Sequence, residues 1–230
     1  MKLFKNICAI AVLTTIPGAA MSESVGVQVI GTIKPAACTP VISNDGNIDY
    51  GIITTTTLNA NRLTQLPNKQ LNFTISCDAP TWLALKAVNG RPGSAAGVTD
   101  ENGAYGGLAP TGVITDNGKY VVGLGMNGDK KIGGYNIMLD HINADGDPVN
   151  NIYKLSSDAT GAWKKMLVLP FYLKEEILSS WTTPSGWEPK IFSNMSGTIN
   201  VQAYINKASE LDLKQPIKLD GQTTIELVYL

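Results

Sequence analysis

The chain has 230 residues, with 18 Lys and Arg against 19 Asp and Glu, three cysteines and one histidine. A net charge of −1 without a basic block argues against binding to nucleic acid or to anionic membranes, because both depend on clustered Lys and Arg. Hydrophobic residues make up 43% of the sequence, which excludes a chain disordered by composition. The single histidine, His141, excludes most hydrolase triads and most zinc sites.

The first 22 residues have the pattern of a secretory signal peptide. A positively charged start with Lys2 and Lys5 precedes an apolar run over residues 7–16, and small residues follow. We expect cleavage after Ala20 or after Ser22. The apolar run is too short to cross about 30 Å of hydrocarbon, and no later stretch approaches the roughly 18 apolar residues that a membrane span needs, so we expect an exported protein without membrane insertion.

Cysteine usage agrees with export. Cys8 lies in the signal peptide, so the exported chain keeps Cys38 and Cys77. An even number of cysteines in an oxidising compartment predicts a disulfide between them. Two free thiols or a metal pair are less favoured, because the sequence lacks Cys-x-x-Cys spacing and other soft ligands.

Apolar and polar residues alternate in many short segments, which is typical of strands with one buried face. The first such segment carries Val25, Val27, Val29 and Ile33 on one face. Further strands are predicted over residues 71–77, 82–87, 119–124, 134–140, 166–173, 198–205 and 224–230. Only residues 172–179 have a helix-like pattern. Short strands separated by turn residues predict an all-β sandwich.

Four of these segments together resemble subunits of chaperone–usher fimbriae, and in particular an uncharacterised branch of fimbrial-like exported proteins. The matching motifs are Val27-x-Val29-x-Gly31-x-Ile33 followed by Cys38, Leu71-x-Phe73-x-Ile75-x-Cys77, Gly134-Tyr135-x-Ile137-x-Leu139-Asp140, and the C-terminal Ile225, Leu227 and Tyr229. They cover about half of the chain. Residues 89–131 and 141–196 match nothing in the family, so we expect them to be insertions in one domain over residues 23–230.

The resemblance implies an immunoglobulin-like sandwich that lacks its final strand. In such a domain the open groove is covered first by a periplasmic chaperone and then by a strand from the adjacent subunit. The implied partners are this chaperone, an outer-membrane usher and the adjacent fimbrial subunit. We expect Ile225, Leu227 and Tyr229 to face the groove, and we expect the protein to pass through the periplasm to the fimbrium at the cell surface.

The N-terminus determines the expected position in the fibre. If residues 25–33 form the first strand of the chain's own sheet, only residues 21–24 precede it, and no donor strand is visible. The sequence therefore predicts a subunit at the tip, whose surface ligand it does not identify. The alternative is a free periplasmic binding or regulatory protein with a sandwich completed by its own chain.

No motif for catalysis, a metal or a cofactor stands out. Residues 143–147 hint at a calcium loop that begins at His141, but its twelfth position is Ile152 instead of Glu, and a hairpin turn at Asp145-Gly146 is favoured. The tryptophans of residues 163–187 suit stacking on sugars, although packing in the core is the more frequent role. We therefore expect a protein that is not an enzyme and uses no cofactor.

Overall fold

The structure is a computed structural model that describes residues 25–34, 36–103, 105–114, 119–158, 160–167, 169–172 and 175–230. Its contacts divide the chain into two units, residues 1–34 and 35–230, and each is described by itself. The described part of the first unit, residues 25–34, contains no strand and no helix. The predicted signal peptide lies outside the described residues.

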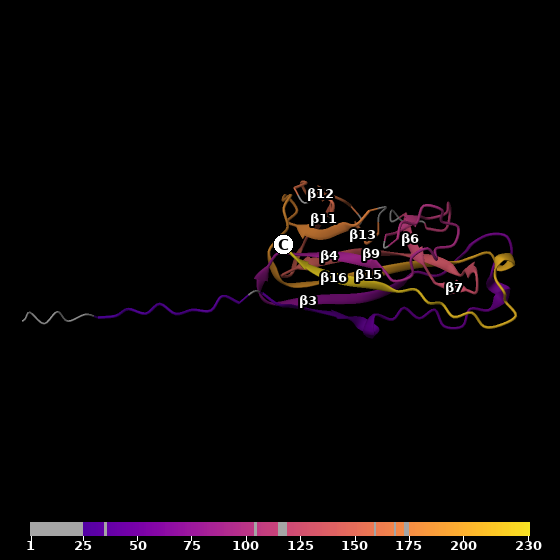
Figure 1. The fold of residues 1–230 in the computed structure, drawn as a ribbon, viewed down its shortest axis with the longest axis horizontal. Helices are drawn as coiled ribbons and strands as arrows, with labels where there is room; N and C mark the ends of the chain where they lie inside the picture. The colour runs from indigo at the N-terminus through magenta and orange to yellow at the C-terminus, as the bar shows by residue number, and fades with distance from the viewer. Residues whose placement is uncertain are drawn as a thin grey trace, which may run out of the picture. The chain divides into compact units, whose positions relative to one another are not determined.

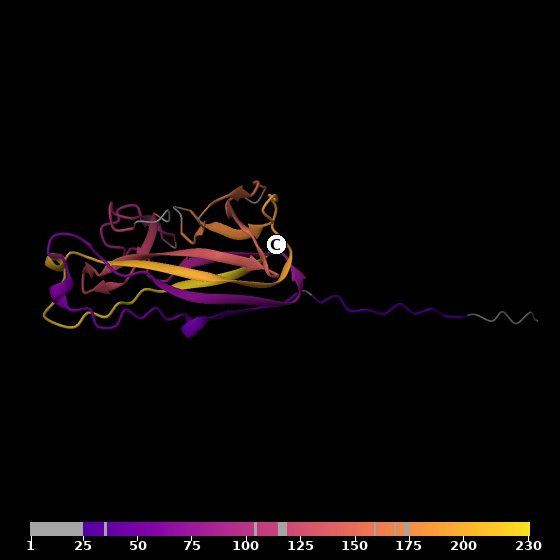
Figure 2. The same ribbon diagram turned by 180° about the vertical axis from the view of Figure 1, so that it is seen from behind.

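The second unit is built from antiparallel strands (Figures 1 and 2). The larger sheet has the order β1 (Cys38–Ile42), β3 (Lys69–Thr81), β15 (Phe192–Ile205), β9 (Gly133–Ala144), β6 (Tyr120–Gly123), β5 (Gly107–Leu108). Three short strands join it at the side: β2 (Thr64–Gln65) on β15, and β10 (Asp147–Pro148) and β13 (Leu169–Pro170) on β9.

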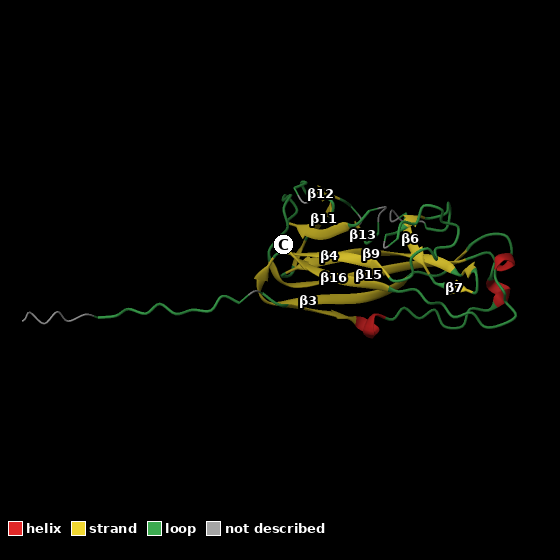
Figure 3. Ribbon diagram, viewed as in Figure 1, coloured by secondary structure: helices red, strands yellow, loops and turns green. Residues whose placement is uncertain are grey.

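The second sheet has the order β12 (Lys164–Lys165), β11 (Asn150–Leu155), β14 (Ile177–Thr182), β4 (Leu83–Asn89), β16 (Thr223–Tyr229). A separate hairpin pairs β7 (Met126–Asn127) with β8 (Lys130–Lys131). The helical segments of the described chain are short 3-10 turns: η1 (Ser43–Gly46), η2 (Thr55–Thr57) and η3 (Ala208–Glu210) (Figure 3). The all-β, immunoglobulin-like sandwich predicted from the sequence is confirmed.

The core lies between the sheets because alternating strands bury one face each. In β3 the side chains of Leu71, Phe73 and Ile75 are buried, whereas the residues between them are exposed. They join one hydrophobic cluster with Leu85 of β4 and Trp181 of β14 from the other sheet. Area removed from water drives this arrangement at about 25 cal/mol per Å² of apolar surface.

The disulfide joins neighbouring strands of the larger sheet. Cys38 and Cys77 are direct partners in the β1–β3 register, and their sulfur atoms are 2.06 Å apart. The pairing predicted from the sequence is confirmed. It fixes the start of β1 to the middle of β3.

The predicted first strand is absent. Residues 25–33 form no strand, and Val25, Val27, Val29 and Ile33 are between 88% and 100% exposed. The first strand of the described chain is β1. Period-two alternation shows that a segment suits a sheet, but a strand also needs a hydrogen-bonded neighbour, and none of the described residues pairs with this segment.

Residues 141–196, expected as an insertion, contribute directly to the second sheet. They supply β11 and β14, and β14 lies between β11 and β4. The helix-like pattern over residues 172–179 is wrong at its end, where β14 begins. Buried polar residues hide the strand in the sequence: the Ser180 hydroxyl donates a hydrogen bond of 2.8 Å to the Leu83 carbonyl.

Candidate strand-accepting groove

Two sheet edges border one cavity. β1 ends the larger sheet with β3 as its neighbour, and β16 ends the second sheet with β4 as its neighbour. Both edge strands contribute side chains to a cavity of about 460 Å³. Pro40 and Ile42 come from β1, and Thr223, Ile225 and Leu227 come from β16. In the described chain no strand pairs with the outer edge of either one.

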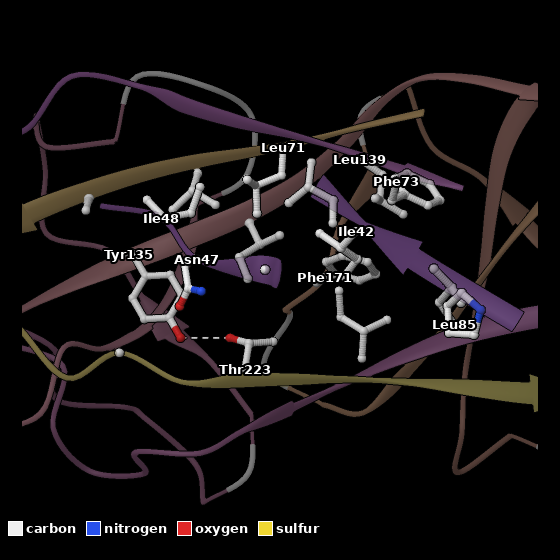
Figure 4. A pocket seen from close by; sticks show the side chains of 18 of the residues that line it. Ile42, Asn47, Ile48, Leu71, Phe73, Leu85, Tyr135, Leu139, Phe171 and Thr223 are labelled. Carbon is white, nitrogen blue, oxygen red and sulfur yellow. Dashed lines mark hydrogen bonds between the residues drawn. The ribbon is translucent and has the colours of Figure 1, made fainter. Parts of the chain in front are cut away.

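The floor of the groove is apolar (Figure 4). Side chains from both sheets form it, including Leu71 and Phe73 of β3, Leu139 of β9, Leu85 of β4 and Phe171. None of the lining residues is charged. Well-packed interiors contain few voids larger than a water molecule, so a space of this size is unfilled core.

A cluster of three hydroxyl groups lies at one side of the groove. The Tyr135 and Thr223 hydroxyls are 2.7 Å apart, and the Tyr172 hydroxyl donates a hydrogen bond of 2.9 Å to the Thr223 oxygen (Figure 4 draws the first pair). Burial raises the pKa of Tyr135 to about 12. Burial also raises the pKa of Tyr172, so both phenols are neutral at physiological pH.

Hydrogen bonds hold the two ends of the groove. At one end the Cys38 N–H donates to the Tyr229 hydroxyl at 2.8 Å. Near the start of β16, the Arg91 guanidinium donates to both carboxylate oxygens of Asp220 at 2.8 Å and to the Gln222 side chain at 2.6 Å. The groove walls are therefore tied to the body of the sandwich on both sides of the open edge.

At the end near the start of β16, the groove continues into a second cavity of about 790 Å³. Residues 48–58 and 211–219 line it. It shares Ile48, Tyr50 and Leu219 with the first cavity. The two cavities together follow one edge of the sandwich.

The residues predicted to face a groove separate into two groups. Ile225 and Leu227 line the cavity, whereas Tyr229 lies at its end with 49% of its surface exposed. Sequence reasoning did not assign the floor residues or Tyr135 to the site. Tyr135 shares the alternation of Ile137 and Leu139 in β9, which was the available signal.

The remaining candidates lie outside the groove. His141 is exposed on β9 and its backbone N–H donates to its neighbour Asp140 at 2.8 Å. Residues 145–146 form the hairpin turn between β9 and β10, as favoured from the sequence. Trp181 is buried, whereas Trp187 is 62% exposed with Lys165 over its ring at 4.4 Å. Among the described residues, no group of three His, Cys, Asp or Glu is placed to hold a metal ion.

Within the part of the chain that the structure describes, no helix is long and apolar enough to span a membrane.

Comparison with known proteins finds similarity to one family model and to two relatives from the same organism. A family of proteins of unknown function, DUF1120, matches residues 27–136, which include β1, β3 and β4. "Uncharacterized protein YhcF" of Escherichia coli (strain K12) is 29% identical over 221 residues, covering 91% of this chain and 92% of the relative. "Protein GltF" of the same organism is 27% identical over 256 residues, covering 98% of each. No solved structure matches the chain significantly.

Proposed function

We propose that this protein is a non-enzymatic structural subunit of a chaperone–usher fimbria, which accepts a strand from another chain between β1 and β16. The uncharged apolar groove between two unpaired edges carries this proposal. Unpaired backbone groups at a sheet edge invite pairing with another chain. An added strand satisfies them by main-chain hydrogen bonds and places every second side chain in the groove.

The occupants follow from the order of assembly in such fibres. A periplasmic chaperone fills the groove after export, and an adjacent subunit replaces the chaperone's strand at an outer-membrane usher. The signal-peptide pattern of residues 1–22 supports export. We place the protein first in the periplasm and then in the fimbrium at the cell surface.

Residues 25–33 are our candidate for the strand that one copy donates to the next. They alternate Val25, Val27, Val29 and Ile33 on one face and are exposed. Nine extended residues cover about 30 Å, and the seven residues of β16 cover about 24 Å, so the segment is long enough to follow the whole edge. Four aliphatic side chains suit a groove without charges.

This candidate changes the position in the fibre. The tip placement depended on residues 25–33 being a strand of the chain's own sheet, and they form no strand. A subunit with a free donor segment and an acceptor groove is suited to the shaft, between two other subunits. We therefore propose a shaft position in place of the tip.

Co-purification with a periplasmic fimbrial chaperone from the same genome tests the proposal. We compare the wild type with Leu227→Asp, Leu227→Ala and the control Thr224→Asp, which places the same charge on the exposed face of β16. A buried aliphatic side chain is worth about 1.5–3 kcal/mol, so Leu227→Ala should weaken capture by at least about tenfold. Leu227→Asp should abolish capture and Thr224→Asp should retain it.

A second measurement addresses variants that fail to fold. A labelled peptide of residues 24–34 is titrated into the purified full-length exported protein, and its anisotropy is recorded. The proposal requires saturable binding to the wild type and weaker binding to Leu227→Ala. A stable wild-type monomer that binds neither chaperone nor peptide would favour the free periplasmic alternative.

A further inference from the structure

The chain enters the sandwich at a fixed point. The Ala37 N–H donates a hydrogen bond of 2.7 Å to the Asp78 carboxylate, and the Asp78 N–H donates one of 3.0 Å to the Ala37 carbonyl. The next residue, Cys38, is held by its disulfide and by the Tyr229 hydroxyl. Residue 37 therefore has a defined position at one end of the groove.

Exposed apolar side chains gather at the same end. Trp82, Tyr229 and Leu230 are 48%, 49% and 44% exposed. Their backbones adjoin, because the Leu230 N–H donates to the Trp82 carbonyl at 3.3 Å and Tyr229 pairs with Leu83. We call these three residues the aromatic end. Clustered exposed aromatic side chains are typical of protein interfaces.

The connection from the donor segment to this end is short. Three residues, 34–36, separate Ile33 from Ala37. Four Cα-to-Cα steps reach at most about 14 Å. When residues 25–33 of one copy lie in the groove of the next, the aromatic end of the first copy must lie against the end of the groove at which the segment leaves.

The two ends of the groove differ in their accessibility. At the end marked by Tyr229, the accepting copy's own residues 37 and 38 are attached, and its own donor segment precedes them in the chain. At the other end the groove opens into the cavity lined by residues 48–58 and 211–219, which we call the distal cavity. One lining residue, Ile52, is 96% exposed. The distal cavity is thus the free end of the groove, and its lining combines apolar side chains such as Ile52 with the charged Asp49, Lys214 and Lys218.

We propose that the aromatic end of one copy docks on the distal cavity of the next copy and forms a fixed joint between successive subunits. The inference rests on the proposed function, because residues 25–33 must first occupy the neighbouring groove. The surfaces that meet are different parts of the molecule, so the contact is heterologous and repeats without closing into a dimer. Such contacts build filaments.

Self-association of the full-length exported protein, measured by analytical ultracentrifugation, tests the joint. Trp82→Ser and Ile52→Ser should each weaken association by about tenfold or more, because each removes apolar area from the contact. Leu108→Ser is the matched control, since Leu108 is 49% exposed on β5, and it should leave association unchanged. In the double variant Trp82→Ser/Ile52→Ser, association should weaken by less than the product of the two single effects, because both substitutions remove the same contact.

Peptide binding separates this inference from the proposed function. The peptide of residues 24–34 has no aromatic end, so it should bind wild type, Trp82→Ser and Ile52→Ser equally well. If the peptide binds but Trp82→Ser and Ile52→Ser associate as strongly as the wild type, the proposed joint is wrong and the proposed function stands. If the peptide does not bind the wild type at all, the proposed function itself fails. Strictly multiplicative effects in the double variant would show that the two residues act at separate contacts.

Discussion

The backbone N–H of Cys38 donates a hydrogen bond of 2.8 Å to the hydroxyl of Tyr229, which lies 191 residues further along the chain. The bond links the first strand of one sheet to the last strand of the other. These two strands otherwise share no pairing, and the apolar groove lies between them. Tyr229 therefore acts at the end of the groove instead of inside it.

Replacing Tyr229 with Phe should remove this link and keep the ring. We expect the free energy of unfolding to fall by about 0.5–1.5 kcal/mol, the usual net value of one hydrogen bond. Urea denaturation measures the change. Tyr153→Phe is a suitable comparison on β11, and an equal loss in both variants would contradict a specific role for the Tyr229 hydroxyl.

Removing the disulfide should cost more. The bond closes a loop with a sequence separation of 39 residues, and the chain-entropy relation gives about 4 kcal/mol for such a loop. We expect the free energy of unfolding of Cys38→Ser/Cys77→Ser, measured by urea denaturation, to be lower than that of the wild type by about this amount. Alkylation of the non-reduced wild type followed by mass spectrometry should find no free thiol, and two modified cysteines would contradict the bond.

Alkaline pH should lower the free energy of unfolding through the buried phenol of Tyr135, which borders the groove. Its pKa is raised to about 12 by burial, against about 10 in an unfolded chain. The folded state thus keeps its proton to higher pH, and the stabilisation is complete below pH ~10 and is lost as pH rises toward about 12.

The matching variant is Tyr135→Phe, which cannot ionise. Between pH 9 and pH 12, measured as the free energy of unfolding in urea, its loss should be smaller than that of the wild type by on the order of 2 kcal/mol. Parallel curves for the two proteins would show that Tyr135 does not titrate as a buried phenol.

Substitutions at His141 should reveal the cost of its left-handed backbone conformation in β9. Its φ of 51° lies in the left-handed region, which costs most L-residues about 1–2 kcal/mol. His141→Gly should raise the free energy of unfolding by about 0.5–1 kcal/mol, and His141→Val should lower it by about 1–2 kcal/mol. His141→Ala should leave chaperone capture intact, because the residue lies outside the groove. Lost capture in a folded His141→Ala protein would contradict this assignment.

The sequence alone was sufficient to locate the strands in which apolar and polar residues alternate. Leu71, Phe73 and Ile75 alternate with exposed residues because β3 lies on the core, and Ile225 and Leu227 of β16 alternate in the same way with exposed residues. Residues 134–140 and 198–205 were also predicted as strands from their alternation, although most of their side chains are buried on both faces. It also predicted the disulfide, since two cysteines remain when residues 1–22, which include Cys8, are taken as a signal peptide. The alternation of Val25, Val27 and Val29 has the same form, but a one-dimensional pattern does not say which chain supplies the partner strand.

Only the tertiary structure decided where the groove lies and what lines it. β14 carries the buried polar residues Ser179 and Ser180, which interrupt any apolar period, and Ser180 is accommodated by the hydrogen bond that its hydroxyl donates to the Leu83 carbonyl of β4. The groove needs two edges, β1 and β16, that are distant in sequence and become neighbours when the sheets stack. Tyr135, Tyr172 and Thr223 meet for the same reason: long-range packing creates their contact, and no local propensity encodes it.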